Sequence, residues 1–312
     1  MEKKNQTSLD QTLRPNNWDE YIGQKNIKDN LWILLEAAKI RNEPPEHILF
    51  HGQPGLGKTT LSYLIARELG RPVKTTSGPA IERVGDLASI ITNLEAGEIL
   101  FIDEIHRLNK NIEEVLYPAM ERGVLDIILG KGPSARTIQL ELQPFTLIGA
   151  TTKMAMLSSP LRSRFSGGVF KLEQYSPDEL AQIVMQSAKK LSININNESA
   201  NMLAGRSRAN PRRVNQFLKR CRDYAEINQV GKIDEGVVEQ TLQMIGVDEQ
   251  GLDKNDREYL DLLKNNFSGG PVGLKTIAAA LQEDESVVED IIEPYLIFLG
   301  LVEKTSRGRI LK

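Results

Sequence analysis

The chain carries one stretch whose residue types and spacing suit it to holding phosphate groups: residues 52–60, Gly-Gln-Pro-Gly-Leu-Gly-Lys-Thr-Thr. Its glycines let the backbone turn N–H groups inward around phosphate oxygens. The side chain of Lys58 can reach the outer phosphates, and the Thr59 hydroxyl can bind Mg²⁺. An apolar run at 48–50 precedes the stretch and a helical pattern follows it, which is the strand–loop–helix setting that a phosphate loop requires. The sequence therefore predicts a nucleotide site.

Two adjacent acids, Asp103 and Glu104, end a second apolar run, 99–102. Beside a metal-bound phosphate, one carboxylate can hold Mg²⁺ through a water molecule while the next polarises the attacking water. We therefore assign Asp103 to the metal and Glu104 to the water. His106 completes an Asp-Glu-Ile-His sequence, and we interpret it as a structural residue or a relay rather than as a proton-transfer group.

Three further polar side chains are candidates that the residue pattern leaves open. Thr152 ends an apolar strand, and it either bonds the γ-phosphate or water or is a plain strand-end residue. Arg164 is either a surface arginine or one that a neighbouring subunit's active site receives, where it would stabilise the charge of phosphoryl transfer. Arg212 begins a helix just after Pro211, and it either reaches the γ-phosphate or lies on a solvated face.

Composition limits the classes of protein that the chain can belong to. The net charge of −3 over 312 residues excludes a polycation, so any nucleic-acid contact must come from a local patch. A single cysteine excludes a disulfide framework and a Cys-rich metal site, and it fits a reducing compartment. The polar N-terminus and the lack of an apolar run of about 18 residues predict neither a signal peptide nor a membrane span. A cytoplasmic enzyme is expected.

The order of strand and helix patterns divides the chain into three domains after a polar tail, 1–11, that we expect to be disordered. Strands alternate with helices over 12–172, which indicates an α/β domain with a parallel sheet. A Gly/Pro/Ser-rich turn between two β-patterned runs predicts a hairpin over 126–143, inserted in that order. Residues 173–246 read as an all-helical domain, and 247–312 as three helices and a small hairpin, typical of a winged helix.

Hydrophobic periodicity gives the expected limits of the individual elements. Strands are expected at 48–50, 72–76, 99–102, 145–152, 301–304 and 309–311. Helices are expected at 26–40, 59–69, 86–94, 111–121, 177–190, 197–207, 210–227, 234–244, 254–265, 273–281 and 285–299.

Basic residues gather on the small C-terminal hairpin: Lys304, Arg307 and Arg309. Gly308 permits a tight turn that presents such side chains to phosphates. The patch has no interleaved aromatic residues, so sequence-neutral binding to a nucleic-acid backbone is favoured over base readout. The alternative is an ordinary solvated hairpin.

Taken together, these motifs resemble those of the AAA+ ATPases, and more closely those of the bacterial family of Holliday-junction branch-migration motors. The resemblance covers roughly residues 12–312. It rests on residues 13–15, 21–24, 76–79, 100–108, 130–133, 149–152, 159–165, 269–274, 293–296 and 307–309. It implies an AAA+ ATPase domain, an all-α lid domain and a C-terminal winged-helix domain that binds DNA.

The resemblance also implies an activity and partners. The chain would be a Mg-dependent ATP hydrolase and DNA translocase or helicase, forming a homohexameric ring around double-stranded DNA. It would drive branch migration of Holliday junctions in homologous recombination and DNA repair, within the SOS response to DNA damage. The junction-binding protein RuvA would be its partner, and the resolvase RuvC a further one.

Roles for individual residues follow from the same resemblance. Catalysis falls to Asp103, Glu104, Thr152 as the sensor at a strand end, and Arg164 as the finger into the neighbouring subunit. Nucleotide contacts fall to Leu13, Arg14, Gly55, Gly57, Lys58, Thr59, Thr60, Glu121, Arg122, Gly123, Tyr175 and Arg212. The metal would be bound by Thr59 and Asp103, and DNA by Lys304, Arg307 and Arg309. The hairpin would dock RuvA through Ile127, Ile128, Leu129, Ile138 and Leu140.

Two other functions are weighed against this one. A clamp-loader-like AAA+ ATPase is disfavoured by the inserted hairpin and the winged helix. A DNA-binding scaffold with an inert nucleotide site is disfavoured by the complete set of Lys58, Asp103, Glu104 and Arg164. DNA-stimulated ATP hydrolysis separates the scaffold from the motor.

Overall fold

The computed structural model describes residues 9–129 and 136–312. The chain forms two compact units, Met1–Tyr175 and Ser176–Lys312. In the described part of the chain, no helix combines the length and apolar character that crossing a lipid bilayer demands.

A five-stranded parallel sheet with the order β2-β3-β6-β1-β7 forms the centre of the first unit. Its strands are β1 (Ile48–His51), β2 (Val73–Ser77), β3 (Ile99–Asp103), β6 (Thr146–Thr151) and β7 (Gly168–Lys171). Since all five strands are parallel, their carboxyl ends share one edge of the sheet. The loops that follow β1, β3 and β6 therefore meet at that edge.

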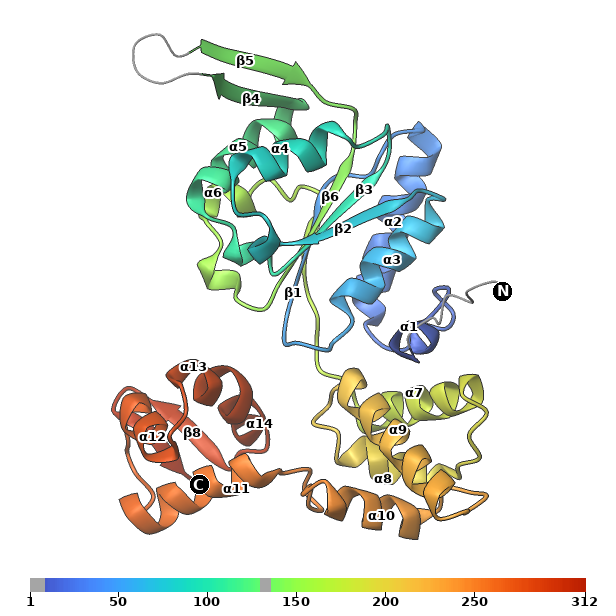
Figure 1. The fold of residues 1–312 in the computed structure, drawn as a ribbon, viewed down its shortest axis with the longest axis vertical. Coiled ribbons are helices and arrows are strands. Elements are labelled where there is room, and N and C mark those ends of the chain that lie inside the picture. The colour runs from blue at the N-terminus through green and yellow to red at the C-terminus, as the bar shows by residue number, and fades with distance from the viewer. Residues whose placement is uncertain (1–8, 130–135) are drawn as a thin grey trace. The chain divides into compact units, whose positions relative to one another are not determined.

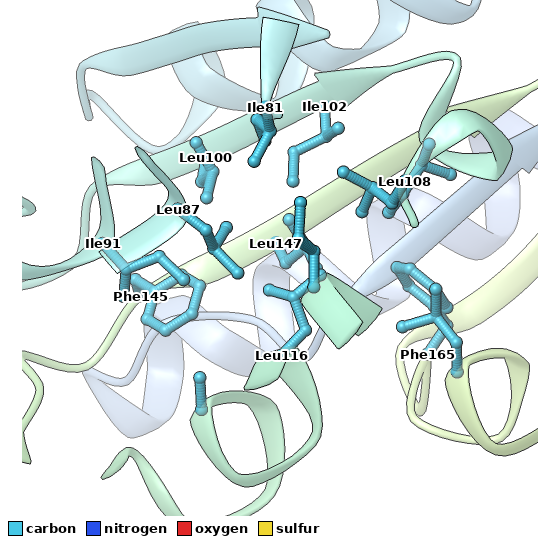
Figure 2. Close-up of a cluster of buried hydrophobic side chains, with 14 of the residues drawn as sticks. Ile81, Leu87, Ile91, Leu100, Ile102, Leu108, Leu116, Phe145, Leu147 and Phe165 are labelled. Carbon is cyan, nitrogen blue, oxygen red and sulfur yellow. The ribbon is translucent and has the colours of Figure 1, made fainter. Parts of the chain in front are cut away.

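Helices cover both faces of this sheet (Figure 1). On one side lie α2 (Lys25–Arg41) and α3 (Lys58–Glu68), and on the other α4 (Val84–Thr92) and α5 (Lys110–Arg122). Side chains alternate along a strand, so Leu100 and Ile102 of β3 face the α4–α5 layer. Figure 2 shows them there, in one buried cluster with Leu87, Leu116 and Leu147.

The predicted hairpin is present, as β4 (Val124–Leu129) and β5 (Arg136–Glu141), an antiparallel pair separate from the main sheet (Figure 1). Gly123 ends α5 in the left-handed conformation and turns the chain directly into β4. Leu125 is fully buried at the base of the hairpin. Residues 130–133, part of the resemblance to the AAA+ family, lie outside the described residues.

Two expectations for the first unit were wrong. Residues 9–11, predicted to be disordered with the rest of the tail, belong to a short helix, α1 (Leu9–Leu13); residues 1–8 lie outside the described structure. Leu13 is buried and fixes the last turn of this helix to the domain. Strand β7 was not predicted, because it is short and half-exposed, with the alternation of an edge strand rather than a continuous apolar run.

The second unit begins with four helices: α7 (Pro177–Lys190), α8 (Asn197–Gly205), α9 (Pro211–Ile227) and α10 (Glu235–Met244). Each starts at a polar residue whose side chain accepts a hydrogen bond from a first-turn backbone N–H: Ser176, Asn196, Asn210 and Asp234. Such caps satisfy donors that a helix start leaves unpaired. The predicted limits of these helices agree with the structure to within two residues.

The C-terminal part contains α11 (Lys254–Asp261), α12 (Leu274–Leu281), α13 (Glu285–Val287), α14 (Glu293–Phe298) and the hairpin β8 (Val302–Thr305) and β9 (Gly308–Leu311). The single helix expected over 285–299 is divided by a π-helical turn, Val288–Ile292. Pro294 lies just after that turn and cannot donate a backbone hydrogen bond. The three-helix and hairpin arrangement of a winged helix is confirmed.

Candidate active site

The phosphate loop joins β1 to α3 as predicted. The ammonium of Lys58 is buried and donates to the carbonyls of Gly52 and Gln53, at 2.7 and 2.9 Å. Thr59 and Thr60, both half-buried, follow it in the first turn of α3. A cation, a helix N-terminus and a metal-binding hydroxyl together form a donor set that fits a nucleoside triphosphate.

Tyr21 and Tyr175 fix the back of this loop. Their hydroxyls lie 3.2 Å apart, and Tyr175 also donates to the carbonyl of Leu56 at 3.3 Å. Gly57 has φ +105°, and a Cβ there would lie 2.7 Å from the Tyr21 hydroxyl. Position 57 therefore requires glycine for two reasons, conformation and space. Burial, together with the neighbouring Tyr175, raises the pKa of Tyr21 well above its usual value.

Asp103 and Glu104 lie at the carboxyl edge of the sheet, as their place after β3 predicts. The Asp103 carboxylate accepts the backbone N–H of Glu104 at 3.0 Å. The Glu104 carboxylate accepts the hydroxyl of Thr152 at 3.1 Å. The structure therefore brings the predicted water-polarising residue and the predicted sensor into direct contact, although 48 positions separate them in the sequence.

His106 lies in the same group of side chains. Its Nε2 is 3.4 Å from Oε2 of Glu104, and its Nδ1 is 2.9 Å from the hydroxyl of Thr151. The imidazole is buried, and this burial lowers its pKa. Two roles were predicted for His106, a structural one and that of a relay. Its polar contacts connect it with other side chains of the candidate active site.

Glu104 adopts a left-handed backbone conformation, with φ +49°, which is uncommon for a residue with a side chain. Gly78, just after β2, packs against it: a Cβ on Gly78 would lie 2.3 Å from the Glu104 carbonyl oxygen. Gly78 therefore allows the turn that aims the Glu104 side chain. Gly78 belongs to a segment of the family resemblance, residues 76–79, but no local signal in the sequence connects it with Glu104.

The predicted nucleotide residues at the start of the chain are anchored in the first unit. Leu13 is buried, and the guanidinium of Arg14 lies over the Tyr63 ring of α3, 5.1 Å from its centroid. Both residues therefore belong to the same layer as the phosphate loop. Their contact with a base is a prediction.

Arg164 and Glu121, predicted for different roles, form an ion pair at 2.9 Å. The guanidinium also lies over the Tyr117 ring, 4.4 Å from its centroid, and donates to the carbonyl of Pro160 at 2.6 Å. The Arg164 side chain is 18% exposed. Arg164 is thus held by its own subunit, on the short helix α6 (Ser159–Arg162) and the turn after it.

Arg122 and Gly123 continue from Glu121 at the end of α5. The Arg122 side chain is largely exposed and pairs with Asp126 at 3.5 Å. Gly123 is the left-handed cap described above. Glu121, Arg122 and Gly123 thus lie where α5 passes into the first strand of the hairpin, and their contact with a nucleotide is a prediction.

Arg212 is exposed in the first turn of α9, where the Asn210 side chain accepts its backbone N–H at 3.0 Å. It belongs to the second unit. Its neighbours Arg208 and Arg213 contact Asp253, at 2.6 and 3.5 Å, and Arg208 also bonds Asp256. This ionic cluster, which was not predicted, joins the lid helices to the start of α11.

The predicted DNA-contacting cations are treated differently by the fold. Lys304 and Arg307 are exposed on the β8–β9 hairpin, and Lys304 pairs with Glu289 at 2.5 Å. Arg309 is buried, and its guanidinium donates to both carboxylate oxygens of Glu293, at 2.7 and 3.1 Å. A direct phosphate contact by Arg309 would require release from Glu293.

The hairpin residues predicted for docking are described in part. Ile138 and Leu140 of β5 are 43% and 37% exposed. Ile127, Ile128 and Leu129 pair through their backbones with the opposite strand, and their side chains lie outside the described part of the structure. The hairpin thus presents apolar side chains at a distance from the core.

A phosphate loop after β1, an acid pair after β3 and a polar residue ending β6, in a sheet of order β2-β3-β6-β1-β7, define the AAA+ class of P-loop ATPases. Sequence models of three RuvB domains match the chain. They are the Holliday junction DNA helicase RuvB P-loop domain at residues 13–171, the RuvB AAA lid domain at 175–248 and the RuvB C-terminal winged helix domain at 249–312.

Individual relatives agree with these matches. The Holliday junction branch migration complex subunit RuvB of Kosmotoga olearia is 52% identical, over 97% of this chain and 88% of its own. That of Fusobacterium nucleatum is 50% identical, over 99% and 93%. The solved RuvB Holliday junction branch migration motor of Thermotoga maritima superposes with a TM-score of 0.87 at 43% identity, over 97% and 96%.

The chain belongs to the RuvB family. The predicted fold class, an AAA+ ATPase domain with an inserted hairpin followed by a helical lid and a winged helix, is confirmed. It is an ATPase with a nucleotide site at the phosphate loop. The clamp-loader-like alternative is wrong, because the matches to RuvB extend over the P-loop, lid and winged-helix segments.

Proposed function

We propose that this chain is the ATP-driven motor that moves Holliday junctions by branch migration in homologous recombination and DNA repair. One observation carries the proposal: the phosphate loop, the acid pair and Thr152 converge at one sheet edge, in a chain that is RuvB-like from residue 13 to its end. An inert nucleotide site would not need a Glu104 carboxylate held by two side chains yet 35% exposed.

Residues at the sheet edge divide the chemistry between them. Lys58 and the backbone of the loop at Gly55, Gly57 and Thr60 hold the phosphates. Thr59 and Asp103 would hold Mg²⁺, which would supply positive charge against the negative charge that develops on the phosphates. Among the described residues no group of three or more His, Cys, Asp or Glu side chains is arranged so that it could hold a metal ion by itself, and Mg²⁺ in such sites is bound largely by phosphate and water oxygens.

Glu104 accepts a proton from the attacking water, and Thr152 positions that water or the γ-phosphate. The side chains of Leu13, Arg14 and Tyr175 line the adenine side. Arg212 responds to the γ-phosphate from the lid. The ionic cluster of Arg208 and Arg213 with Asp253 then ties the start of α9 to the winged helix, so a movement of the lid is passed on within one compact unit.

Subunit contacts complete the site in a homohexameric ring around duplex DNA. Arg164 serves as the finger for the neighbouring subunit's ATP, and Glu121, Arg122 and Gly123 lie beside it. The ion pair between Glu121 and Arg164 supports a shared role for these residues on one rim of the domain. An isolated subunit should therefore bind nucleotide and hydrolyse it slowly.

Partner contacts follow from the two hairpins. The β4–β5 hairpin docks RuvA, and the exposed Ile138 and Leu140 support an apolar contact. The β8–β9 hairpin contacts the DNA backbone through Lys304 and Arg307, and Arg309 would join them once it is released from Glu293. RuvC is a further partner in the same junction complex. The SOS response and the cytoplasm are the expected setting.

Three functional domains are proposed: residues 12–172 for the ATPase with its hairpin 126–143, 173–246 for the lid and 247–312 for the winged helix. The ranges of the three matching sequence models support these limits. In the structure the lid and winged-helix segments belong to one compact unit, which fits their joint movement.

Branch migration of a synthetic four-way junction, with and without RuvA and with MgATP, tests the proposal. The expected result is ATP-dependent strand exchange that RuvA stimulates and that Lys58→Ala abolishes. Arg164→Ala should keep nucleotide binding and lose turnover in the assembled ring. ATP hydrolysis that DNA does not stimulate, without any junction movement, would point to a different AAA+ activity.

A further inference from the structure

Two consecutive threonines at the end of β6 are both connected to Glu104. Thr152 donates to Oε2 of Glu104 directly, at 3.1 Å. The hydroxyl of Thr151 lies 2.9 Å from Nδ1 of His106, whose Nε2 is 3.4 Å from the same oxygen. One threonine therefore reaches Glu104 on its own, and the other reaches it only through the imidazole.

The proton positions in this chain follow from what each group can do. An ionised carboxylate only accepts hydrogen bonds, so Nε2 of His106 must carry the proton that faces Glu104. Nδ1 of a neutral imidazole is then an acceptor, and Thr151 donates to it. The Thr151 oxygen accepts the backbone N–H of Lys153 at 3.0 Å. Burial of His106, which lowers its pKa, favours the neutral ring that this chain requires.

We propose that His106 is a positioning residue for ATP hydrolysis: it holds Oε2 of Glu104 and connects it to the end of β6 through Thr151. Since Thr152 and His106 both engage Oε2, we assign the attacking water to Oε1. The inference rests on the proposed role of Glu104 as the base. Neutral donors suit that role, because an arginine at the same place would favour the ionised carboxylate and weaken it as a base.

The burial of the network separates it from an ordinary surface contact. Thr151 is fully buried, and the His106 side chain is 4% exposed. The backbone of Glu104 is held in a left-handed turn against Gly78, so the remaining freedom of the carboxylate lies in its side-chain torsions. His106 and Thr152 together restrict those torsions, and misplacement of a reacting group by about 1 Å can cost on the order of a hundredfold in rate.

The test measures steady-state ATP hydrolysis by the full chain with duplex DNA, together with equilibrium binding of a fluorescent ATP analogue. His106→Leu fills the space with an apolar side chain but removes the contact with Glu104 and the hydrogen bond with Thr151. We expect kcat to fall about ten- to a hundredfold, with KM and nucleotide affinity changed less than about twofold. His106→Gln retains an amide N–H that can face Glu104 and should recover most of the loss.

Thr151 supplies a matched pair of variants. Thr151→Val removes the hydroxyl and keeps the shape, so kcat should fall in the same direction, whereas Thr151→Ser should stay near wild type. In the double variant Thr151→Val with His106→Leu, the loss should equal that of His106→Leu alone, since both changes break one chain of polar contacts. If His106→Leu does not fold, the comparison of Thr151→Val with Thr151→Ser tests the same chain of contacts.

Three results would overturn the inference. An unchanged kcat in folded His106→Leu would make the histidine dispensable. Equal losses in His106→Leu and His106→Gln would make the contact with Glu104 irrelevant, and additive losses in the double variant would separate the two residues. Glu104→Gln separates the failure of the proposed function from that of the inference. If this variant still hydrolyses ATP, the proposed base is wrong. If it is inactive while His106→Leu keeps the parent activity, only the inference about His106 fails.

Discussion

Two glutamates in this protein are held in opposite ways, and the contrast separates a group kept for chemistry from one kept for structure. Glu104, at the edge of the parallel sheet, is contacted by a hydroxyl and an imidazole, and its side chain is 35% exposed. Glu293, at the start of α14, is contacted by the Arg309 guanidinium on both oxygens and by the Tyr259 hydroxyl at 3.1 Å. The Glu293 side chain is 2% exposed.

The two carboxylates differ in their remaining capacity to accept a proton. Glu293 is neutralised by a cation and saturated, and the pair raises the pKa of Arg309 through its hydrogen bonds. Tyr259, buried beside Glu293, has a raised pKa and stays protonated as a donor. Glu104 has neutral partners on one oxygen, so it can still take a proton. A buried ion pair holds the base of the wing, whereas one hydrogen bond and one longer contact with an imidazole hold the catalytic candidate.

The largest effect is expected when the chemical side of this contrast is broken. Glu104→Gln replaces the base by an amide of the same shape, so kcat for ATP should fall about a hundred- to ten-thousandfold. Nucleotide affinity and the melting temperature should stay near those of the parent. Radiometric hydrolysis and calorimetry check both parts. A large fall in melting temperature with little loss of turnover would place Glu104 among the structural carboxylates instead.

The same substitution at Glu293 should do the reverse. Glu293→Gln leaves the Arg309 charge buried without its partner, which costs about 3 kcal/mol of stability or more. Urea unfolding of the full chain should show the winged-helix part melting earlier, while ATP hydrolysis without DNA stays close to normal. The double variant Glu293→Gln with Arg309→Met removes both charges and should recover most of the stability.

The wing cations allow a finer test, because only some of them are free of the buried pair with Glu293. Lys304→Ala should weaken binding to duplex DNA and lower the slope of log K against log salt by about 1, as expected for one phosphate contact. Lys254→Ala, an exposed lysine of α11 outside the wing, is the matched control and should leave the slope unchanged. An unaltered slope for Lys304→Ala would remove it from the DNA contacts.

The smallest effect is expected at His47. Its ring nitrogens contact backbone groups, whereas those of His106 contact side chains of the candidate active site. Leu147 N–H donates to Nδ1 of His47 at 2.9 Å, and Nε2 lies 3.1 Å from the Met120 carbonyl, so both ring nitrogens are bound to backbone. Burial lowers the pKa of His47 below its ordinary 6.5. The unfolded state therefore binds the proton more readily than the folded state does. The contribution of His47 to the stability of the fold should be fully present above pH 6.5 and should be lost as the pH falls below that value.

Urea midpoints at pH 7.5 and 5.5 measure this decline. In His47→Gln the difference between the two midpoints should shrink, because the titrating group is gone. Hydrolysis by His47→Gln at pH 7.5 should match the parent, since its contacts are to backbone rather than to Glu104. An equal pH dependence in parent and variant would mean that other groups govern acid unfolding.

Local patterns in the sequence were enough to predict the class of protein and most of its elements. The phosphate loop depends on neighbours in sequence, as does the acid pair that ends β3, because each is a strand end with fixed residue types. Helix caps such as Ser176 and Asn210 are also local signals. For these features the physics acts over one or two turns of chain, so single-sequence reasoning suffices.

Only the tertiary structure decided how those residues are held. The sequence put Arg309 in the DNA-contacting set, but the fold places the buried Glu293 16 positions earlier beside it. Nothing local pairs Thr151 with His106, 45 positions away, or Gly78 with the Glu104 carbonyl. The sequence determined which groups could do chemistry, because residue type and spacing are written in it. Which carboxylate stays available was decided by burial and by partners that come together only when the chain folds.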